Sequence, residues 1–398
     1  MLSARSRDLI AETLPSVGPV ITDITRHFYR TLFDEHPDLL HRMFNRGNQA
    51  NGEQQNAIAS ALVGFASLLA HRPYIRPEDV VRRIAHKHAS VGVTPQQYTL
   101  VHRYLMRAFV DVLGPTLSSE AATAWDETYW LMANGLAAAE GELYASVDAK
   151  PGEAWRYWQV VLRAEEAFDV VSLHLQPVDG APADAFRAGQ YVTLAAALPD
   201  GAFQLRQFSL SSAPEDPLWR ITVRRHRGDE TRPAGEVSTF LHERLGIGST
   251  VQISPPYGEV VLDESDAPLL FASSGIGVTP LVSMLRHLSA TGSRRRVTVL
   301  HHDRTPWTHP LRFEVEECVR QIGGRLHVWY DDPSGAPLHA LQGAPDLSGV
   351  EVAPGTRAFL CGPASFTRAL RPMLVHAGVA PAAIRHEVFG PDMWHAPS

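Results

Sequence analysis

Cysteine is scarce in this chain of 398 residues, which contains only Cys318 and Cys361. The two cysteines lie far apart and lack the close spacing of metal ligands, so the sequence excludes a disulfide framework and a cysteine-built metal site. Two isolated thiols are typical of a reduced, cytoplasmic protein. Lysine is equally rare, at Lys87 and Lys150 only, and arginine supplies nearly all of the positive charge.

Long apolar runs are absent as well. No stretch of about 18 uncharged apolar residues occurs, which excludes a membrane-spanning helix. The opening sequence MLSARSRDLIAE places acids directly behind its first apolar positions, so it lacks the apolar core of a secretory signal and predicts the start of a helix. A formal net charge of -7 argues against nucleic acid as a partner.

The composition is that of an ordinary globular protein, with 44% hydrophobic and 20% charged residues. At roughly 100 to 200 residues per domain, a chain of this length predicts two or three domains. The residue pattern changes around a Pro-Gly pair within 148–153 and again near Pro268. We therefore predict a multidomain protein with a helical domain over residues 1–147, an antiparallel β-barrel over 153–263 and an α/β domain over 266–398.

Each segment has its own periodicity. The first repeats apolar residues at helical spacing, as in 20–32 and 58–69. The second contains short β runs separated by Gly, Pro and Asp clusters, at 157–162, 191–194, 207–210, 220–224 and 250–253. The third alternates buried-type strands with helices, as a doubly wound parallel sheet requires: strands at 269–272, 297–300, 326–330 and 358–360, and helices at 280–289, 311–322 and 365–377.

A histidine closes the apolar face of one predicted helix. Val81, Ile84, Ala85 and His88 lie three or four residues apart and share a face that ends near Gly92. His88 therefore points inward. A core histidine hydrogen-bonded to a polar neighbour is the simpler interpretation, and a metal ligand is the alternative.

Two later residues favour the metal ligand. The run Thr94-Pro95-Gln96-Gln97 has the cap, proline and glutamine of a helix start, which places Tyr98 in the first turn of the next helix. Glu140 occupies a position where helical spacing demands an apolar residue, and a buried carboxylate needs a partner. A hydrogen bond from the His88 ring to such a partner would make a metal-bound imidazole a stronger electron donor. A slightly rotated helix that leaves Glu140 in water is the alternative.

A second group of polar and aromatic residues precedes His88. Tyr29 flanks one apolar stripe, Gln54 lies four residues before Ile58, and Phe44 follows between two helices. A tyrosine and a glutamine over an apolar pocket suit hydrogen bonds to a bound, partly anionic dioxygen, although each alone is typical of ordinary packing or surface.

These residues carry a family resemblance. The segments HFYRTLF, MFN, NGEQQNAI, RIAHKHASVGVTPQQY and AEGELY together resemble the globin domain of bacterial flavohemoglobins. The resemblance implies a globin fold that holds heme b, with His88 as the iron ligand, Lys87, Tyr98 and Glu140 around it, and Tyr29, Phe44, Gln54 and Ile58 on the oxygen side. Ile58 departs from the leucine that is usual in this family, which alters the expected shape of the ligand pocket.

The antiparallel segment carries a flavin-type strand. In Arg206-Gln207-Phe208-Ser209, strand alternation sends Arg206 and Phe208 to one face. An arginine can neutralise a diphosphate and an aromatic side chain can cover a flat ring, although such a tetrapeptide alone is commonly just a strand. Gly235-Glu236-Val237-Ser238 then opens a predicted helix over 239–245, whose amides could hold phosphate.

The third segment carries a nucleotide-type turn, Gly275-Ile276-Gly277-Val278-Thr279-Pro280, between a buried strand and a helix. Glycines there let the backbone approach a pyrophosphate, although the third glycine of the usual fingerprint is missing. Cys361-Gly362-Pro363 ends another predicted strand at the edge where ligands bind, and a plain strand-to-helix connection is the alternative. Asp303 and Arg304 follow a third strand, where an acid suits an unphosphorylated ribose and an arginine a 2′-phosphate, so NADH and NADPH both stay open.

The segments RQFSLSS, GEVSTFL, GIGVTP, CGP and HEVFGP resemble, in order and spacing, the ferredoxin-NADP reductase-like module that follows the globin in flavohemoglobins. The resemblance implies FAD held by Tyr191, Arg206, Gln207, Phe208, Ser209, Glu236, Val237 and Ser238, with Phe389 near the flavin ring. It also implies a nicotinamide nucleotide, preferably NADH, held by residues 275–280 and 361–363. Phe208 stands where the family has tyrosine, which removes one flavin hydrogen bond.

The whole resemblance implies a nitric oxide dioxygenase, in which NAD(P)H reduces FAD, FAD reduces the heme, and oxygen bound to ferrous heme converts nitric oxide to nitrate. Two alternatives stay open: a reductase of hydroperoxides, ferric chelates or quinones, and a heme gas sensor or oxygen carrier. The attached reductase argues against a sensor, which has no need of fast turnover. We expect a monomer whose partners are the small molecules O2 and nitric oxide.

Overall fold

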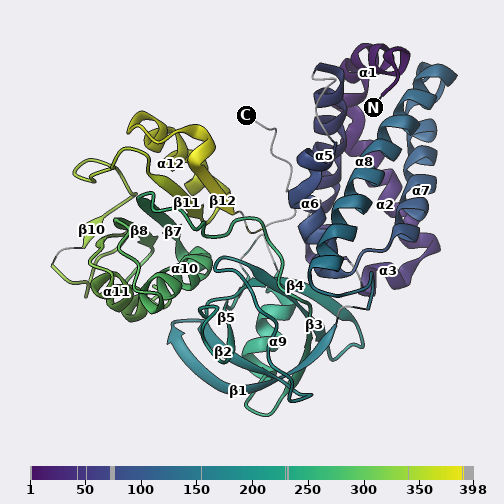
Figure 1. Cartoon of the computed structure of the whole chain (residues 1–398). Helices are drawn as coiled ribbons and strands as arrows, with labels where there is room; N and C mark the ends of the chain where they lie inside the picture. The colour runs from purple at the N-terminus through teal and green to yellow at the C-terminus, as the bar shows by residue number, and fades with distance from the viewer. Residues whose placement is uncertain are drawn as a thin grey trace. The chain divides into compact units, whose positions relative to one another are not determined.

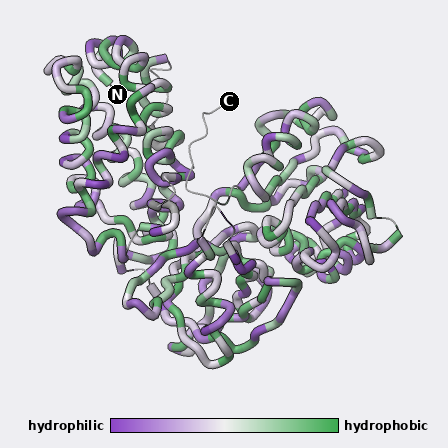
Figure 2. The backbone as a smooth tube through the Cα atoms, turned by 180° about the vertical axis from the view of Figure 1, so that it is seen from behind, coloured by the Kyte–Doolittle hydropathy of each residue, from purple (hydrophilic) through white to green (hydrophobic). Residues whose placement is uncertain are grey.

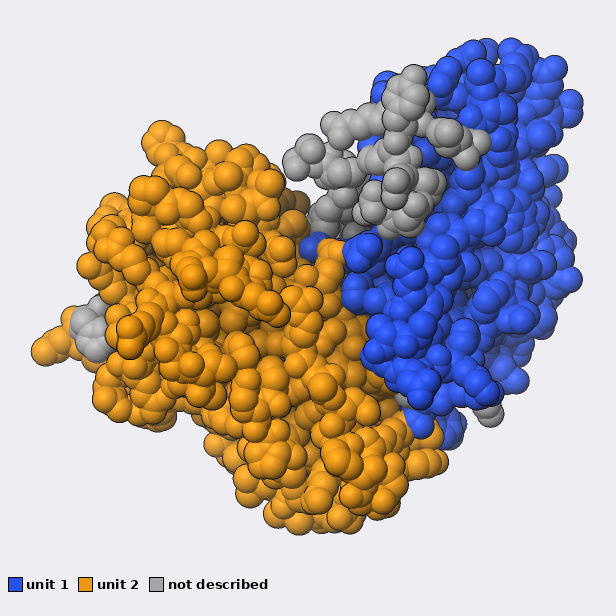
Figure 3. Space-filling view, in the orientation of Figure 1, with its two compact units in different colours: residues 1–155, 195–206, 390–397 blue, residues 156–194, 207–389, 398 orange. Residues whose placement is uncertain are grey.

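The computed structural model describes residues 2–42, 44–50, 52–71, 77–153, 155–228, 230, 233–338, 340–387 and 389 (Figure 1). The chain forms two compact units, coloured separately in Figure 3. Unit 1 comprises residues 1–155, 195–206 and 390–397, and unit 2 comprises residues 156–194, 207–389 and 398. Apart from residues 195–206, the antiparallel sheet and the parallel sheet therefore lie together in unit 2.

The first part of unit 1 is helical, as predicted. Its α-helices are α1 (Ala4–Val17), α2 (Ile21–Glu35), α3 (Pro37–Arg42), α4 (Arg46–Ala50), α5 (Glu53–His71), α6 (Pro77–Val91), α7 (Pro95–Leu113) and α8 (Ser119–Ser146). The Ser3 hydroxyl caps α1 by accepting a hydrogen bond from the Ser6 amide at 3.0 Å. At the start of α7, Thr94 and Gln97 form the predicted capping box. Both predicted helix starts are therefore confirmed.

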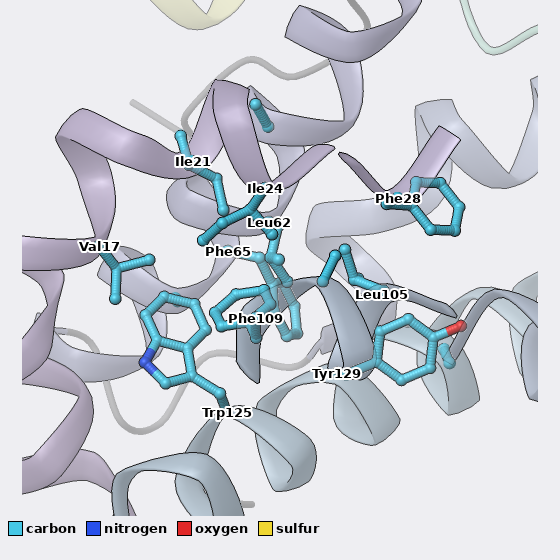
Figure 4. Packing of buried hydrophobic residues seen from close by; sticks show 14 of the residues in the cluster. Val17, Ile21, Ile24, Phe28, Leu62, Phe65, Leu105, Phe109, Trp125 and Tyr129 are labelled. Carbon is cyan, nitrogen blue, oxygen red and sulfur yellow. The ribbon is translucent and has the colours of Figure 1, made fainter. Parts of the chain in front are cut away.

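The helices of unit 1 pack around one apolar cluster. Phe28, Leu62, Phe65, Phe109 and Trp125 come from four different helices, and each is at most 1% exposed (Figure 4). Burying a side chain of this size contributes about 1.5 to 3 kcal/mol. Isolated helices of this length are marginal in water, so this shared core holds them together.

Apolar and polar residues alternate along the helices, as the hydropathy colouring of Figure 2 shows. Such alternation gives a helix one face for the core and one for water. No helix in the described part of the chain is long and apolar enough to cross a membrane.

The antiparallel sheet has the strand order β4-β3-β6-β1-β2-β5. Its strands are β1 (Arg156–Ala167), β2 (Val170–Pro177), β3 (Tyr191–Ala197), β4 (Phe203–Ser209), β5 (Trp219–Arg224) and β6 (Thr250–Ile253). β1 was predicted to end at residue 162, but it continues to pair with β2 as far as Ala167. In that extension Arg163 and Glu166 are half-buried and Glu165 is exposed, so their polarity is compatible with a part of the sheet that faces water.

The parallel sheet has the strand order β10-β9-β8-β7-β11-β12. Its strands are β7 (Leu269–Ser274), β8 (Val297–Asp303), β9 (Arg325–Tyr330), β10 (Leu341–Gln342), β11 (Arg357–Cys361) and β12 (Ile384–Glu387). Helices α10 (Val278–Ala290), α11 (Arg312–Gln321) and α12 (Ala364–His376) connect them. The order reverses between β7 and β11, which makes the carboxyl ends of these two strands the expected ligand edge.

Two boundaries near the predicted sites differ from expectation. Helix α9 (Glu236–Arg244) begins three residues before the predicted start at 239, so Glu236, Val237 and Ser238 form its first turn. Strand β8 continues to Asp303 instead of ending near residue 300. Both differences arise because pairing and packing extend an element beyond its apolar residues.

Candidate functional site

His88 lies in the last turn of α6, and two polar side chains meet its ring. Its Nδ1 atom is 2.9 Å from the Tyr98 hydroxyl and 2.9 Å from Glu140 Oε1. The Tyr98 hydroxyl donates to the same carboxylate oxygen. Glu140 is 2% exposed, so the alternative in which it faces water is wrong. The structure therefore brings His88, Tyr98 and Glu140 together, as the helical spacing predicted.

The direction of these hydrogen bonds defines the histidine tautomer. Burial raises the pKa of Tyr98, and the charge of Glu140 raises it further, so Tyr98 keeps its proton and donates it to Glu140. Both neighbours of His88 Nδ1 then present acceptor oxygens. Nδ1 consequently donates a proton to these oxygens, which leaves Nε2 as the ring nitrogen that can bind a metal. A neutral imidazole with a carboxylate behind it is the usual form of a metal-binding histidine.

The surroundings of His88 fit an iron ligand of the heme type. Within the described residues, no cluster of three or more His, Cys, Asp or Glu side chains offers a complete site for a bare metal ion. Heme iron takes four ligands from its porphyrin and needs only one protein side chain, and an inward histidine can supply it. The imidazole is 31% exposed although Val81 and Ala85 on the same helix face are fully buried, so the ring opens onto space beside the core.

The corner between α6 and α7 holds this cluster in place. Gly92 adopts a φ of +78°, a conformation that favours glycine and that ends α6 directly after the histidine turn. From α8, the Tyr144 hydroxyl donates to the Val93 carbonyl at 2.9 Å and the Tyr129 hydroxyl donates to the Tyr98 carbonyl at 2.7 Å. Residue spacing within single helices does not reveal these two contacts between a side chain and the backbone of another segment.

The oxygen-side residues include a buried hydroxyl. Tyr29 on α2 is 2% exposed, and its hydroxyl makes no hydrogen bond within the described chain. Burial raises its pKa, and the nearby amides of Gln54 and Gln49 lower it in part. The Phe44 ring lies 5.7 Å from the Tyr29 ring at an interplanar angle of 82°. An unsatisfied buried hydroxyl costs about 1 to 3 kcal/mol, a cost that a ligand accepting its hydrogen bond would offset.

Gln49 is a site residue that sequence reasoning missed. Its side-chain oxygen accepts a hydrogen bond from Gln55 Nε2 at 3.1 Å, which leaves its NH2 group buried and without a partner among the described residues. Gln49 lies on α4, a helix of five residues. So short a helix shows no periodicity, and only proximity to Tyr29 reveals the residue. Ile58 on α5 is partly buried against the same core.

The flavin-type residues lie on β4 and its neighbours. Arg206, Gln207 and Phe208 are half-buried, whereas Ser209 is 7% exposed. Tyr191 opens β3 and exchanges two backbone hydrogen bonds of 2.8 Å with Tyr257. An arginine and an aromatic ring on one strand fit a flavin diphosphate and ring.

The first turn of α9 supplies further backbone amides. Gly235 precedes the helix, and a Cβ atom there would lie 2.6 Å from the Ser238 hydroxyl oxygen, so a larger residue would have to displace that side chain. Ser238 Oγ accepts from the His226 amide at 3.1 Å, and Val237 is 2% exposed. The backbone amides at the start of a helix such as α9 are of the kind that can bind an anion.

The two predicted nucleotide turns are in backbone contact. Residues 275–277 form a 3-10 turn between β7 and α10, which is the predicted strand-turn-helix arrangement. A Cβ atom on Gly277 would lie 2.6 Å from the Cys361 carbonyl carbon. Gly362 likewise faces Ser274: a Cβ atom added to Gly362 would lie 3.1 Å from the Cβ atom of Ser274. The turn at 361–363 therefore packs directly against the predicted nucleotide turn.

Asp303 is engaged inside the protein. Its side chain is 1% exposed and accepts hydrogen bonds from Arg224 (3.0 Å), from Thr308 (2.7 Å) and from the Arg304 amide (2.7 Å). Burial alone would raise its pKa, but His301 and Arg224 lower it well below the usual range. An acid with these partners has little capacity left for ribose hydroxyls. The exposed acids at this sheet edge follow β9 instead, at 331–332.

Replacing Asp303 with asparagine tests this assignment. We expect unit 2 to lose about 2 kcal/mol of stability, because Arg224 loses a buried, charged hydrogen-bond partner. We expect the ratio of kcat/KM for NADH to that for NADPH to stay within about twofold, because Asp303 is occupied by its own partners. A ribose contact worth about 1.4 kcal/mol would change this ratio tenfold. The midpoint of thermal flavin release and steady-state kinetics measure the two effects. A tenfold change in the ratio would show that Asp303 contacts the ribose.

Phe389, the predicted neighbour of the flavin ring, follows β12 and is 49% exposed. Three other residues of the HEVFGP segment (388, 390 and 391) lie outside the described residues.

These features define a class of protein before any comparison. A helical domain with an inward histidine backed by a carboxylate precedes an antiparallel sheet with a flavin-type strand and a doubly wound sheet with a nucleotide turn. This is a globin-type domain followed by a ferredoxin-NADP reductase-like module.

Comparisons with known proteins agree. The flavohemoprotein of Rhizobium meliloti (strain 1021) is 34% identical over 406 residues, which cover 99% of this chain and 100% of that protein. The crystal structure of flavohemoglobin from Malassezia yamatoensis, with bound FAD and heme, matches 98% of this chain and 100% of its own, with a TM-score of 0.89 and 32% identity. The chain belongs to the flavohemoprotein family.

The reductase part also has a separate structural relative. The FAD/NAD binding domain of nitric oxide dioxygenase from Vibrio cholerae O1 biovar El Tor covers 59% of this chain and 99% of that domain, with a TM-score of 0.55 and 31% identity. No protein-family model matches the chain.

Proposed function

We propose that the protein is a nitric oxide dioxygenase that consumes NAD(P)H and O2 and releases nitrate. Similarity over the full length to flavohemoproteins supports the proposal, as does the Vibrio cholerae domain, which belongs to an enzyme of that activity. The observation that carries it is the buried cluster of His88, Tyr98 and Glu140 in the same chain as a nucleotide turn. Heme, FAD and nicotinamide supply the electron transfer when they are bound.

On the heme side, the residues act through charge and shape. Glu140 holds the proton of His88 on Nδ1, which increases the electron density that Nε2 offers to iron. The buried Tyr29 hydroxyl, assisted by Gln54, would donate a hydrogen bond to a heme ligand on which negative charge develops. Phe44 packs edge-on against Tyr29 and would restrict a ligand there to a small molecule such as a diatomic gas. Lys87 is half-buried next to the iron ligand.

On the reductase side, we propose that Arg206 neutralises the FAD diphosphate and that Phe208 and Phe389 cover the flavin ring. The first turn of α9, residues 236–238, would offer amides to phosphate. Residues 275–280 and 361–363 would hold the pyrophosphate and nicotinamide of NAD(P)H, because their glycines let the two backbones meet at one place.

We also propose three domains over 1–147, 153–263 and 266–398 in a monomeric, cytoplasmic protein. The change from helical to antiparallel to parallel architecture supports these boundaries. Cys318 and Cys361 are both free and buried, which suits a reducing compartment.

Steady NADH oxidation in air tests the proposed function. Each nitric oxide needs one electron besides O2 to become nitrate, so we expect added nitric oxide to accelerate NADH oxidation with two nitrate ions formed per NADH. Acceleration by ferric chelates, quinones or hydroperoxides without acceleration by nitric oxide would support a reductase instead. A protein that binds O2 but shows no acceleration by any acceptor would be a sensor or carrier.

Tyr29→Phe removes one hydroxyl from the oxygen side. We expect nitric oxide-dependent turnover to fall about 100-fold, because a single donor to developing negative charge is worth roughly that factor. Heme content, measured by absorbance, should stay unchanged. Tyr104→Phe is the matched control, since Tyr104 as a whole residue is as buried as Tyr29 but its hydroxyl donates to Glu35. Equal rates in the two variants would refute the role of Tyr29.

A further inference from the structure

The RQFSLSS segment ends beyond β4 in two buried serines. Ser211 and Ser212, which follow β4, are at most 2% exposed and both bind Arg220 of β5. Arg220 donates through Nε to Ser211 Oγ at 3.0 Å and through Nη2 to the Ser211 carbonyl at 2.6 Å. The Arg220 amide donates to Ser212 Oγ at 3.1 Å. The guanidinium of Arg220 is thus oriented by the same segment that carries the flavin-type residues.

Arg220 also contacts α11, one of the helices that connect the strands of the parallel sheet. It donates two hydrogen bonds to Glu314, in the first turn of α11, at 2.8 and 3.1 Å. The Arg220 side chain is 8% exposed and the Glu314 side chain 20% exposed. A paired, two-bond contact of this kind restricts both distance and angle, because the guanidinium is a planar fork.

Glu314 has a second arginine partner. Arg286 of α10 donates to Glu314 Oε1, and it also forms a pair of hydrogen bonds with Asp216, at 3.0 and 2.8 Å. Asp216 lies between β4 and β5 and also accepts from the Ala213 amide at 2.7 Å. Two acids and two arginines therefore alternate in one network that begins and ends on the antiparallel sheet.

The network connects the two predicted cofactor sites. Helix α10 begins directly after Gly277 of the nucleotide turn and carries Arg286 near its end. The β4 strand ends at Ser209, two residues before Ser211. A displacement of α10 would thus carry the nucleotide turn away from the flavin-type strand unless Glu314 and Asp216 held Arg286 in place.

We propose that Glu314 is a positioning residue for hydride transfer, and that the network of Arg220, Glu314, Arg286 and Asp216 sets the distance between the nicotinamide and flavin sites. Reacting atoms must lie about 3 to 3.5 Å apart, and a misplacement of about 1 Å can cost about 100-fold in rate. Loss of the Glu314 charge leaves two partly buried guanidinium groups close together without a shared negative charge between them. This inference rests on the proposed binding of FAD and NAD(P)H.

Anaerobic flavin reduction by NADH in the full-length holoprotein tests the proposal. In Glu314→Gln we expect the limiting rate of flavin reduction to fall at least about tenfold, with the apparent Kd for NADH changed less than about threefold. Glu314→Asp, which keeps the charge, should recover part of the rate. Glu317→Gln is the matched control, because Glu317 lies on the same helix with its side chain 48% exposed and pairs with Arg320 at the surface. It should react at the wild-type rate.

A second variant tests the proposal independently in case Glu314→Gln loses FAD or does not fold. Arg286→Met leaves the contact between Arg220 and Glu314 intact and should lower the limiting rate in the same way. Wild-type rates in either variant with FAD bound, or a change confined to the Kd for NADH, would overturn the positioning role. If wild-type protein binds FAD but neither NADH nor NADPH reduces it, the proposed function fails first and this inference fails with it.

Discussion

His88→Ala is expected to produce a protein that binds FAD but does not retain heme. The imidazole is the one group placed by α6, Tyr98 and Glu140 to bind iron, and alanine offers no ligand atom. The heme absorption band of the purified protein should be lost, and nitric oxide-dependent NADH oxidation should fall at least about 100-fold, since the iron chemistry depends on this ligand. The flavin absorbance should persist. Absorption spectra and nitrate yields measure both effects.

Two additions make the result specific to the ligand. Added imidazole can occupy the space of the deleted ring, so it should restore part of the heme band in His88→Ala. His71→Ala is a matched control, because His71 ends α5 at the surface and bonds only to the Ser67 carbonyl, at 2.7 Å, among its described contacts. A His88→Ala protein that keeps its heme band without imidazole would show that another residue binds the iron.

Gly277→Val is expected to abolish reduction of the flavin by NADH while leaving heme and FAD in place. A Cβ atom at this position would lie 2.6 Å from the Cys361 carbonyl carbon and 2.9 Å from the Gly362 amide nitrogen. Both neighbours are backbone atoms of the second turn, so they cannot rotate away as a side chain would. The two turns must separate, and we expect kcat/KM for NADH to fall at least about 100-fold through misplacement of the nucleotide.

Gly246→Val is the control for this prediction. It makes the same substitution in unit 2, at a glycine with no atom within 4 Å of its Cβ position and with no left-handed φ. It should reduce its flavin at the wild-type rate. A Gly277→Val protein that also matched the wild type would place the nucleotide away from the contact between the two turns.

The helical spacing of Val81, Ile84, Ala85 and His88 was sufficient to predict an inward histidine, because an α-helix repeats its faces over a few residues. The same spacing suggested that Glu140 is buried, but it could not exclude a small helix rotation. The observed contact of Glu140 with the His88 ring decided that question. The rotation of α8 about its axis depends on how it packs against α6 and α7. The spacing of residues within α8 carries no information about that packing.

Gln49 and Asp303 show where local reasoning is insufficient. Gln49 lies on a helix too short for periodicity, and its amide becomes relevant only because α2 brings Tyr29 beside it. Asp303 stands where a ribose-binding acid is expected, yet Arg224 from the other sheet engages it. Arg224 lies 79 residues away from Asp303 in the sequence, so no local sequence pattern predicts the contact.

The amino-acid sequence by itself determined the family, the order of the helical, antiparallel and parallel segments, and the positions of the motifs, because each depends on residues within a few turns or one strand. The tertiary structure decided the histidine tautomer, the backbone contact between the two nucleotide turns and the ionic network around Glu314. These features join residues that are distant in the chain, and only packing of whole elements specifies which of them meet.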